Sequence, residues 1–98
     1  MVINVFFDEQ FEDAEVIDIP ESLWEEIENI KAAFFKWLFN KKINHKYWVT
    51  IDGEKKYCSY RAEAFVYWLN NFYLLNNNKK AICLNTEKID YSRPKINF

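Results

Sequence analysis

Cys58 and His45 are the side chains best suited to nucleophilic catalysis, because a thiol needs a nearby base to become a thiolate. Both fall on or near a segment that is typical of a β-hairpin, so the fold could bring them together. Cys58, however, lies in a strand-like stretch as a small apolar residue would, and His45 lies in a polar loop between Asn44 and Lys46. A single Cys and a single His without a local motif are weak evidence for a catalytic pair. We therefore expect no enzyme activity and assign no catalytic residue.

Metal and phosphate chemistry have little support in the sequence. A structural zinc site needs four Cys or His ligands in closely spaced pairs, whereas His45, Cys58 and Cys83 lie far apart. A phosphate-binding loop needs several glycines so that the backbone can approach the phosphate, and the chain has one glycine, Gly53. We expect no metal and no cofactor. We also expect both cysteines to be buried thiols, since cysteine pairs inside cells are usually reduced.

The most distinctive feature is electrostatic: residues 8–30 carry ten carboxylates and no lysine or arginine. Residues 1–30 therefore have a net charge of −10, and residues 31–98, with thirteen bases and five acids, have a net charge of +8. Ten carboxylates without a fixed partner do not define a general acid and base pair. Two interpretations stay open. The acidic part pairs with the basic part of the same chain, or it presents a negative surface that selects a basic partner and speeds its association.

Aromatic residues near these acids could anchor such a partner inside a charged rim. Phe11 and Trp24 follow the acids closely, and Phe39 lies outside the main apolar stripe of its helix. The alternative is that all three belong to the core of a small domain. The predicted partner-binding residues, which combine carboxylates with two aromatic anchors, are Asp8, Glu9, Phe11, Glu12, Asp13, Glu15, Asp18, Trp24, Glu25 and Glu28.

A nucleic-acid partner is the main alternative from another class. The basic second part contains lysines, arginine and tyrosines that could contact phosphates and stack on bases, among them Tyr57, Tyr60, Arg61, Tyr67 and Lys79–Lys80. These bases are dispersed over several elements, and the acidic segment of the same domain would oppose a polyanion. We therefore expect a protein partner in preference to a nucleic acid.

The first part of the chain predicts two short strands and a helix. Residues 2–7 and 14–19 are rich in β-branched and aromatic residues, which favour strands. Ser22 and Glu25 have the spacing of a capping box, so a helix should begin near Leu23. On a 3.6-residue period its buried face comprises Leu23, Ile27, Ile30, Phe34 and Leu38.

The second part predicts a hairpin, a second helix, a strand and a terminal edge segment. Residues 47–51 and 56–60 flank Asp52–Gly53, where a tight turn needs a residue that tolerates positive φ. Ser59 could cap a helix over 61–75, with Tyr67 and Leu74 pointing outward and a core face made of Ala62, Phe65, Leu69 and Phe72. Residues 81–85 form a buried strand in this scheme, and Pro94 limits residues 95–98 to an edge strand or docked tail.

Together these elements predict one domain over residues 1–98 with an α+β fold, in which two helices pack on one face of a mainly antiparallel sheet of four to five strands. Half of the residues are hydrophobic and 19% are aromatic, which is enough for a core. No apolar run reaches the length needed to cross a bilayer, and the N-terminus lacks the features of a signal peptide. We expect a cytoplasmic protein, and the surplus aromatics on the first helix leave a homodimer open.

The stretch WLNNFYLLNNNKKAICLN (residues 68–85) followed by RPKINF (residues 93–98) resembles, in layout, small bacterial immunity proteins of polymorphic and contact-dependent toxin systems. The shared layout is an aromatic helix, a polar break, a strand and a Pro-x-Ile-x-Phe tail, and it covers about the last third of the chain. The resemblance implies a non-catalytic protein that binds a cognate toxin, often a basic nuclease, and blocks it. A phage-encoded inhibitor of a bacterial defence nuclease is mechanistically close, and a small nucleic-acid-binding regulatory module is the alternative function.

Overall fold

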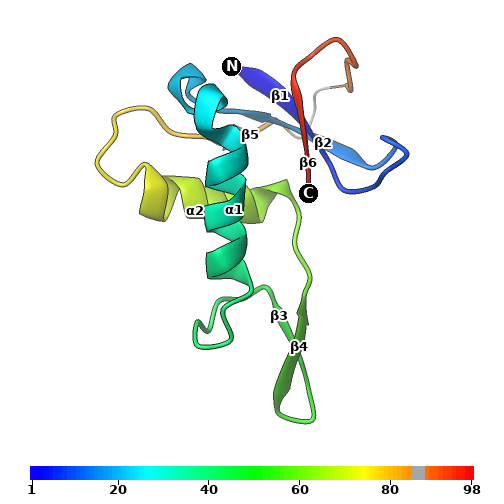
Figure 1. Ribbon diagram of the computed structural model, residues 1–98, viewed down its shortest axis with the longest axis vertical. Helices are drawn as coiled ribbons and strands as arrows, with labels where there is room; N and C mark the ends of the chain where they lie inside the picture. Colours follow the sequence, from blue (N-terminus) through cyan, green and yellow to red (C-terminus); the bar gives the residue numbers. More distant parts are fainter. Residues whose placement is uncertain (85–87) are drawn as a thin grey trace.

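The computed structural model describes residues 1–84 and 88–98 and shows an α+β fold (Figure 1). The elements follow in the order β1 (Val2–Phe6), β2 (Ala14–Asp18), the 3₁₀ helix η1 (Glu21–Glu26), α1 (Ile27–Leu38), β3 (Trp48–Ile51), β4 (Glu54–Cys58), α2 (Ala62–Trp68), the π-helical turn η2 (Leu69–Tyr73), β5 (Ile82–Cys83) and β6 (Lys95–Asn97). The predicted fold class is confirmed. Within the described residues, no helix is both long enough and apolar enough to cross a membrane.

The main sheet has four strands in the order β5-β2-β1-β6. β2 pairs antiparallel with β1 and with β5, whereas β6 runs parallel to β1. The predicted terminal segment is thus an edge strand. The predicted strand over 81–85 shortens to Ile82–Cys83, and its expected end at Asn85 lies outside the described residues. Strands β3 and β4 form a separate two-stranded sheet that extends away from the body of the molecule (Figure 1).

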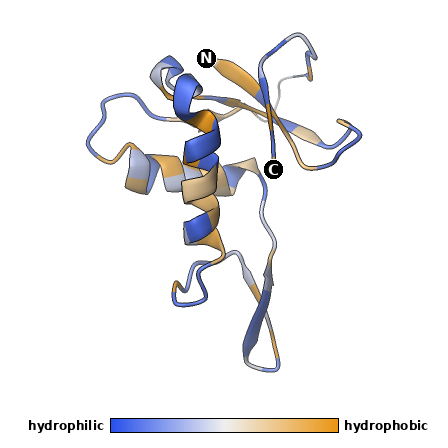
Figure 2. Ribbon diagram, viewed as in Figure 1, coloured by the Kyte–Doolittle hydropathy of each residue, from blue (hydrophilic) through white to orange (hydrophobic). Residues whose placement is uncertain are grey.

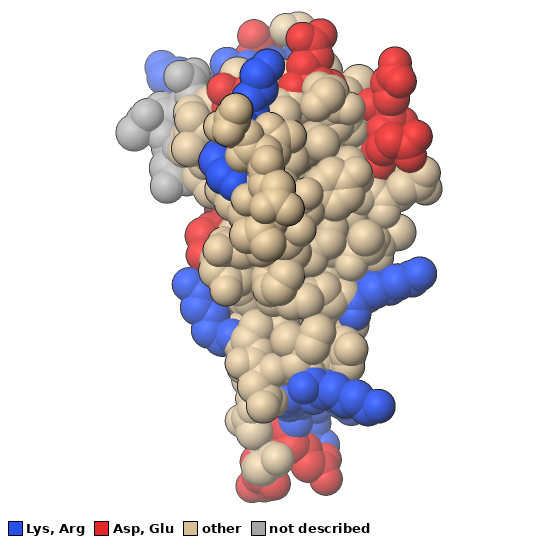
Figure 3. Space-filling view, turned by 90° about the vertical axis from the view of Figure 1, so that its left-hand side faces the viewer, with Lys and Arg blue, Asp and Glu red and all other residues tan. Residues whose placement is uncertain are grey.

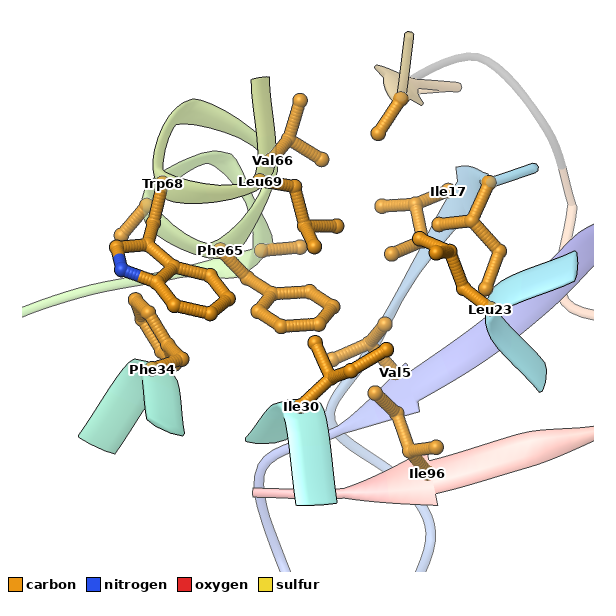
Figure 4. Packing of buried hydrophobic residues seen from close by; sticks show 14 of the residues in the cluster. Val5, Ile17, Leu23, Ile30, Phe34, Phe65, Val66, Trp68, Leu69 and Ile96 are labelled. Atoms are coloured by element: carbon orange, nitrogen blue, oxygen red, sulfur yellow. The ribbon is translucent and has the colours of Figure 1, made fainter. Parts of the chain in front are cut away.

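The core lies between one face of this sheet and the two helices (Figure 4). Alternation along the strands turns Ile3, Val5 and Ile17 toward the helices, because successive side chains of a strand point to opposite faces. The predicted stripe of the first helix is confirmed, since all five of its residues are buried. In Figure 2 the hydrophobic colouring gathers where helices and sheet meet, while β4 is largely hydrophilic.

The first helix begins differently from the prediction. Residues 21–26 form a 3₁₀ helix, and the α-helix starts only at Ile27. Pro20 occupies the cap position and no side chain caps the helix, so the predicted capping box of Ser22 and Glu25 is wrong. Pro20 has a fixed φ and no N–H, which suits the residue just before a first turn. The carboxylate of Glu25 is therefore left for other contacts.

The second helix also departs from the prediction. Its α-helical part ends at Trp68, and Leu69–Tyr73 form a π turn in which the N–H of Leu74 donates to the carbonyl of Leu69 at 2.6 Å. A π turn inserts one extra residue and shifts the phase of everything after it. Leu74 is consequently 2% exposed and Phe72 is 53% exposed, so the predicted places of these two residues are reversed. Tyr67 points outward as predicted.

The predicted hairpin is confirmed around Asp52 and Gly53. Both residues have positive φ, at 53° and 78°, as a two-residue turn with the twist of the flanking strands requires. A register shift between Val49 and Thr50 marks a bulge in this hairpin. Isolated two-stranded hairpins are marginal in water. Here the base of the hairpin is tied to the body, because the hydroxyl of Tyr47 donates to the carboxylate of Glu63 in α2 at 2.9 Å. The cap position of α2 is Arg61 and not Ser59, so the predicted cap is wrong.

Candidate partner-binding site

The acidic segment is divided between the two ends of β2. One part lies in the loop before the strand, which contains residues 8–13, and the other lies in η1 and the start of α1, after the strand (Figure 1). The loop contains the predicted anchor Phe11, and η1 contains the predicted anchor Trp24. The structure therefore presents two separate acidic groups, each with one aromatic residue, in place of a single continuous surface.

Two of the predicted carboxylates, Asp13 and Glu15, are held by Arg61. The guanidinium donates to both oxygens of Asp13, at 2.9 and 2.7 Å, and to Glu15 at 2.9 Å. This hydrogen bond from Arg61 lowers the pKa of Asp13 below its ordinary value, and the same pairing raises the pKa of Arg61. Glu15 also accepts from the N–H of Ala62 at 3.1 Å, so it caps α2 in place of the predicted Ser59. Asp13 and Glu15 therefore have a structural role and are not free to bind a partner.

Four more carboxylates have partners within the chain. Asp8 accepts from the N–H groups of Glu12 and Asp13 and so shapes the acidic loop. Asp18 pairs with the N-terminal ammonium of Met1 at 2.8 Å. The partners of Glu26 and Glu28 are the amide of Asn29 at 2.8 Å and the ammonium of Lys31 at 2.9 Å. The pair of Glu28 is exposed and contributes little to stability.

The carboxylates of Glu9, Glu12, Glu21 and Glu25 form no hydrogen bond or ion pair with the part of the chain that the structure describes. Glu9 and Glu12 flank Phe11, whose ring is occupied by this molecule: Lys95 lies over it at 3.9 Å and Phe6 packs edge-on at 5.1 Å. An aromatic ring that is already covered by a cation offers a poor anchor. The loop is therefore the weaker of the two acidic groups as a binding site.

Glu21 and Glu25 border a pocket of about 550 Å³ that is lined by Met1, Ser22 and the half-buried Trp24 as well. We call these five residues the Trp24 site. Trp24 packs partly on the core, so its ring is held in place while one side stays open. The site combines an aromatic surface with two carboxylates that lack a partner among the described residues. It can therefore bind a lysine or arginine whose alkyl part lies on the indole.

Of the predicted partner-binding residues, Trp24 and Glu25 line the Trp24 site and Glu28 pairs with Lys31, whereas Glu21 was not among those predicted. The spacing gave no signal, because the sequence predicted a helix only from Leu23, whereas Glu21 begins a 3₁₀ helix. In Figure 3 acidic and basic side chains both lie at the top of the molecule, and a broad uncharged surface lies below them.

The alternative Cys–His pair has an unfavourable geometry. Nε2 of His45 lies 2.7 Å from the carbonyl of Leu38, and the thiol of Cys58 donates to that same carbonyl at 3.3 Å. Nδ1 of His45 accepts from the N–H of Tyr47 at 3.2 Å, so both ring nitrogens are engaged by the backbone. Burial raises the pKa of Cys58, which opposes thiolate formation. Both Cys58 and Cys83 are free.

Within residues 1–84 and 88–98, no three His, Cys, Asp or Glu side chains lie close enough together to hold a metal ion. Comparisons with protein-family models, curated proteins and solved structures found no match to this chain.

Proposed function

We propose that this chain is a non-catalytic inhibitor that binds a basic partner protein through the Trp24 site. We further propose that the partner is a nuclease-type toxin, for which the chain serves as the immunity protein. The observation that carries the proposal is the position of Trp24 between Glu21 and Glu25, two carboxylates without a partner among the described residues.

The chemistry of a nuclease supports this choice of partner. A nuclease that binds phosphates has a positive active-site surface, and carboxylates placed on a rigid element attract such a surface and accelerate association. An aromatic anchor inside a polar rim supplies the energy that charge alone does not. A phage-encoded inhibitor of a bacterial defence nuclease would use the same contacts, so the identity of the bound nuclease separates these two forms of the proposal.

The test compares two variants with the same change in charge at opposite ends of β2. Glu21→Lys/Glu25→Lys reverses the Trp24 site, and Glu9→Lys/Glu12→Lys reverses the exposed loop. Wild type and both variants are used to capture proteins from lysate of the source cells, and quantitative mass spectrometry identifies a nuclease whose capture depends on Glu21 and Glu25. The purified nuclease is then assayed with each form of the chain.

We expect wild type and the loop variant to inhibit the nuclease stoichiometrically, and the Trp24-site variant to bind at least about tenfold more weakly, because like charges oppose the complex. Added salt should weaken wild-type binding. Equal inhibition by all three forms would place the contact elsewhere. Capture of nucleic acid without a protein would instead favour the nucleic-acid-binding alternative.

A further inference from the structure

At and just after the π turn, three large apolar side chains that are close together in the sequence lie on the surface. Phe72, Tyr73 and Leu75 are 53%, 47% and 62% exposed. They are held by neighbours, since Phe72 packs on Trp37 with ring centroids 5.6 Å apart and Tyr73 packs on Trp68 at 5.9 Å. On a soluble protein, a contiguous patch of exposed apolar side chains often marks an interaction surface.

This apolar surface is connected to the Trp24 site by a chain of hollows. Phe72, Tyr73 and Leu75 line a pocket of about 660 Å³ together with Lys79. Lys79 and Glu21 both line the next pocket, of about 360 Å³, and Glu21 in turn lines the Trp24 pocket. The three pockets adjoin through these shared residues, and we call them together the groove, which runs from η1 to the segment after η2. The segment after η2 lies on the side of the molecule that faces the viewer in Figure 3, where a few basic side chains interrupt an uncharged surface.

The chemistry of the groove changes along its length. The end at Glu21 and Glu25 is negative, and the end at Phe72 and Leu75 is apolar. Lys79 and Lys80 line the pocket between the two ends, together with Asp18 and Glu21. Asparagines 76–78 line the apolar end, and their amides offer both donors and acceptors of hydrogen bonds. A polypeptide backbone in an extended conformation needs this combination of donors and acceptors, because its N–H and C=O groups are not paired within the segment.

We infer that the groove binds an extended segment of the basic partner, which places lysine or arginine over Glu21 and Glu25 and an apolar side chain against Phe72 and Leu75. This inference rests on the proposed function and names the chemistry of the partner's contact. A single strand of nucleic acid fits less well, since its phosphates would meet Glu21 and Glu25. Burial of apolar surface at the Phe72 end stabilises the complex, and the carboxylates at the other end fix the direction in which the partner segment binds.

The probe is a phage-displayed library of random peptides of about 12 residues, which span roughly 40 Å when extended. It is selected on the intact wild-type chain at about 50 mM sodium chloride, where surface charges are weakly screened. Enriched peptides are then measured against Phe72→Ser/Leu75→Ser, Glu21→Lys/Glu25→Lys and the control Tyr57→Ser. Tyr57 is 56% exposed on the hairpin, so the control removes an equally exposed aromatic away from the groove.

We expect enriched peptides with basic residues near one end and apolar residues near the other. Phe72→Ser/Leu75→Ser should lose at least about tenfold in affinity at both low and high salt, because the lost contact is apolar. Glu21→Lys/Glu25→Lys should lose affinity mainly at low salt. Tyr57→Ser should bind as wild type does.

Three outcomes overturn the inference, and a fourth, given last, overturns the proposed function. If Phe72→Ser/Leu75→Ser binds every peptide as wild type does while Glu21→Lys/Glu25→Lys loses binding, the groove extension is wrong and the Trp24 site stands. If no peptide is enriched, or if single-stranded oligothymidine binds and loses affinity only with the Phe72 and Leu75 changes, the occupant is not a peptide segment. If the Glu21 and Glu25 changes alone have no effect, the proposed function fails.

Discussion

Leu74 and Phe72 give the sharpest test of the π turn, because a regular α-helix over residues 61–75 would bury Phe72 and expose Leu74. The structure shows the opposite, with Leu74 2% exposed and Phe72 53% exposed. Truncating a fully buried Leu to Ala costs about 2–5 kcal/mol, from lost transfer energy plus the cavity that remains. We therefore expect Leu74→Ala to lower the free energy of unfolding by about 3 kcal/mol.

Leu75→Ala is the matched control, since it removes the same atoms from the neighbouring residue, which is 62% exposed. Exposed substitutions usually change stability by no more than about 0.5 kcal/mol. Phe72→Ala should cost about 1 kcal/mol, because half of the ring is solvated and the other half packs on Trp37. The order of destabilisation is thus Leu74, then Phe72, then Leu75.

Urea unfolding followed by tryptophan fluorescence and circular dichroism measures these differences. For a domain of about this size, 1 kcal/mol corresponds to a shift of about 4–8 °C in Tm, so Leu74→Ala should be resolved in a thermal scan as well. A larger loss for Phe72→Ala than for Leu74→Ala would refute the phase shift. It would mean that the second helix continues with its ordinary period.

Two pH profiles follow from the shifted pKa values of Asp13 and Tyr47. Arg61 holds the pKa of Asp13 below its ordinary value, so this stabilisation is present above about pH 4 and is lost as pH falls through the lowered pKa; urea midpoints at pH 7 and pH 3 should differ less in Arg61→Gln than in wild type. Burial, and then the hydrogen bond to Glu63, raise the pKa of Tyr47 above its ordinary value. Stability should therefore fall as pH rises past about 10, and Tyr47→Phe should show a smaller alkaline loss in the same assay.

Local periodicity was sufficient to predict the elements whose burial follows a simple repeat. The stripe from Leu23 to Leu38 and the turn at Gly53 are set by nearest neighbours along the chain, so the sequence alone carries the information. The parallel pairing of β6 with β1 joins opposite ends of the chain and has no local signal. The π turn has no local signal either, since the burial of Leu74 depends on its contacts with the rest of the core.

The sequence predicted the chemistry of the candidate site, which combines carboxylates with an aromatic residue. It did not predict that the acidic segment is split into two groups at the two ends of β2. The excess of carboxylates and the presence of Trp24 can be read directly from the composition. Which carboxylates serve the fold could not be read, because Arg61 reaches Asp13 and Glu15 only through tertiary structure. The two open interpretations of the acidic segment therefore apply to different residues. Six of the ten carboxylates have partners within the chain, and the other four have none among the described residues: Glu9, Glu12, Glu21 and Glu25.

The helix dipole offers a simpler reason for Glu21 and Glu25 to lie where a helical segment begins. Only Glu21 lies in the first turn of η1, where an exposed acid gains about 0.3–1 kcal/mol. Glu25 lies beyond that turn, so Glu21→Gln/Glu25→Gln should change the urea midpoint little while binding to the partner nuclease weakens. If the dipole were the main reason for these acids, the same variant would lose stability by about 1 kcal/mol and keep its binding. A single pair of measurements on one variant therefore separates a structural role for the two carboxylates from a role in recognition.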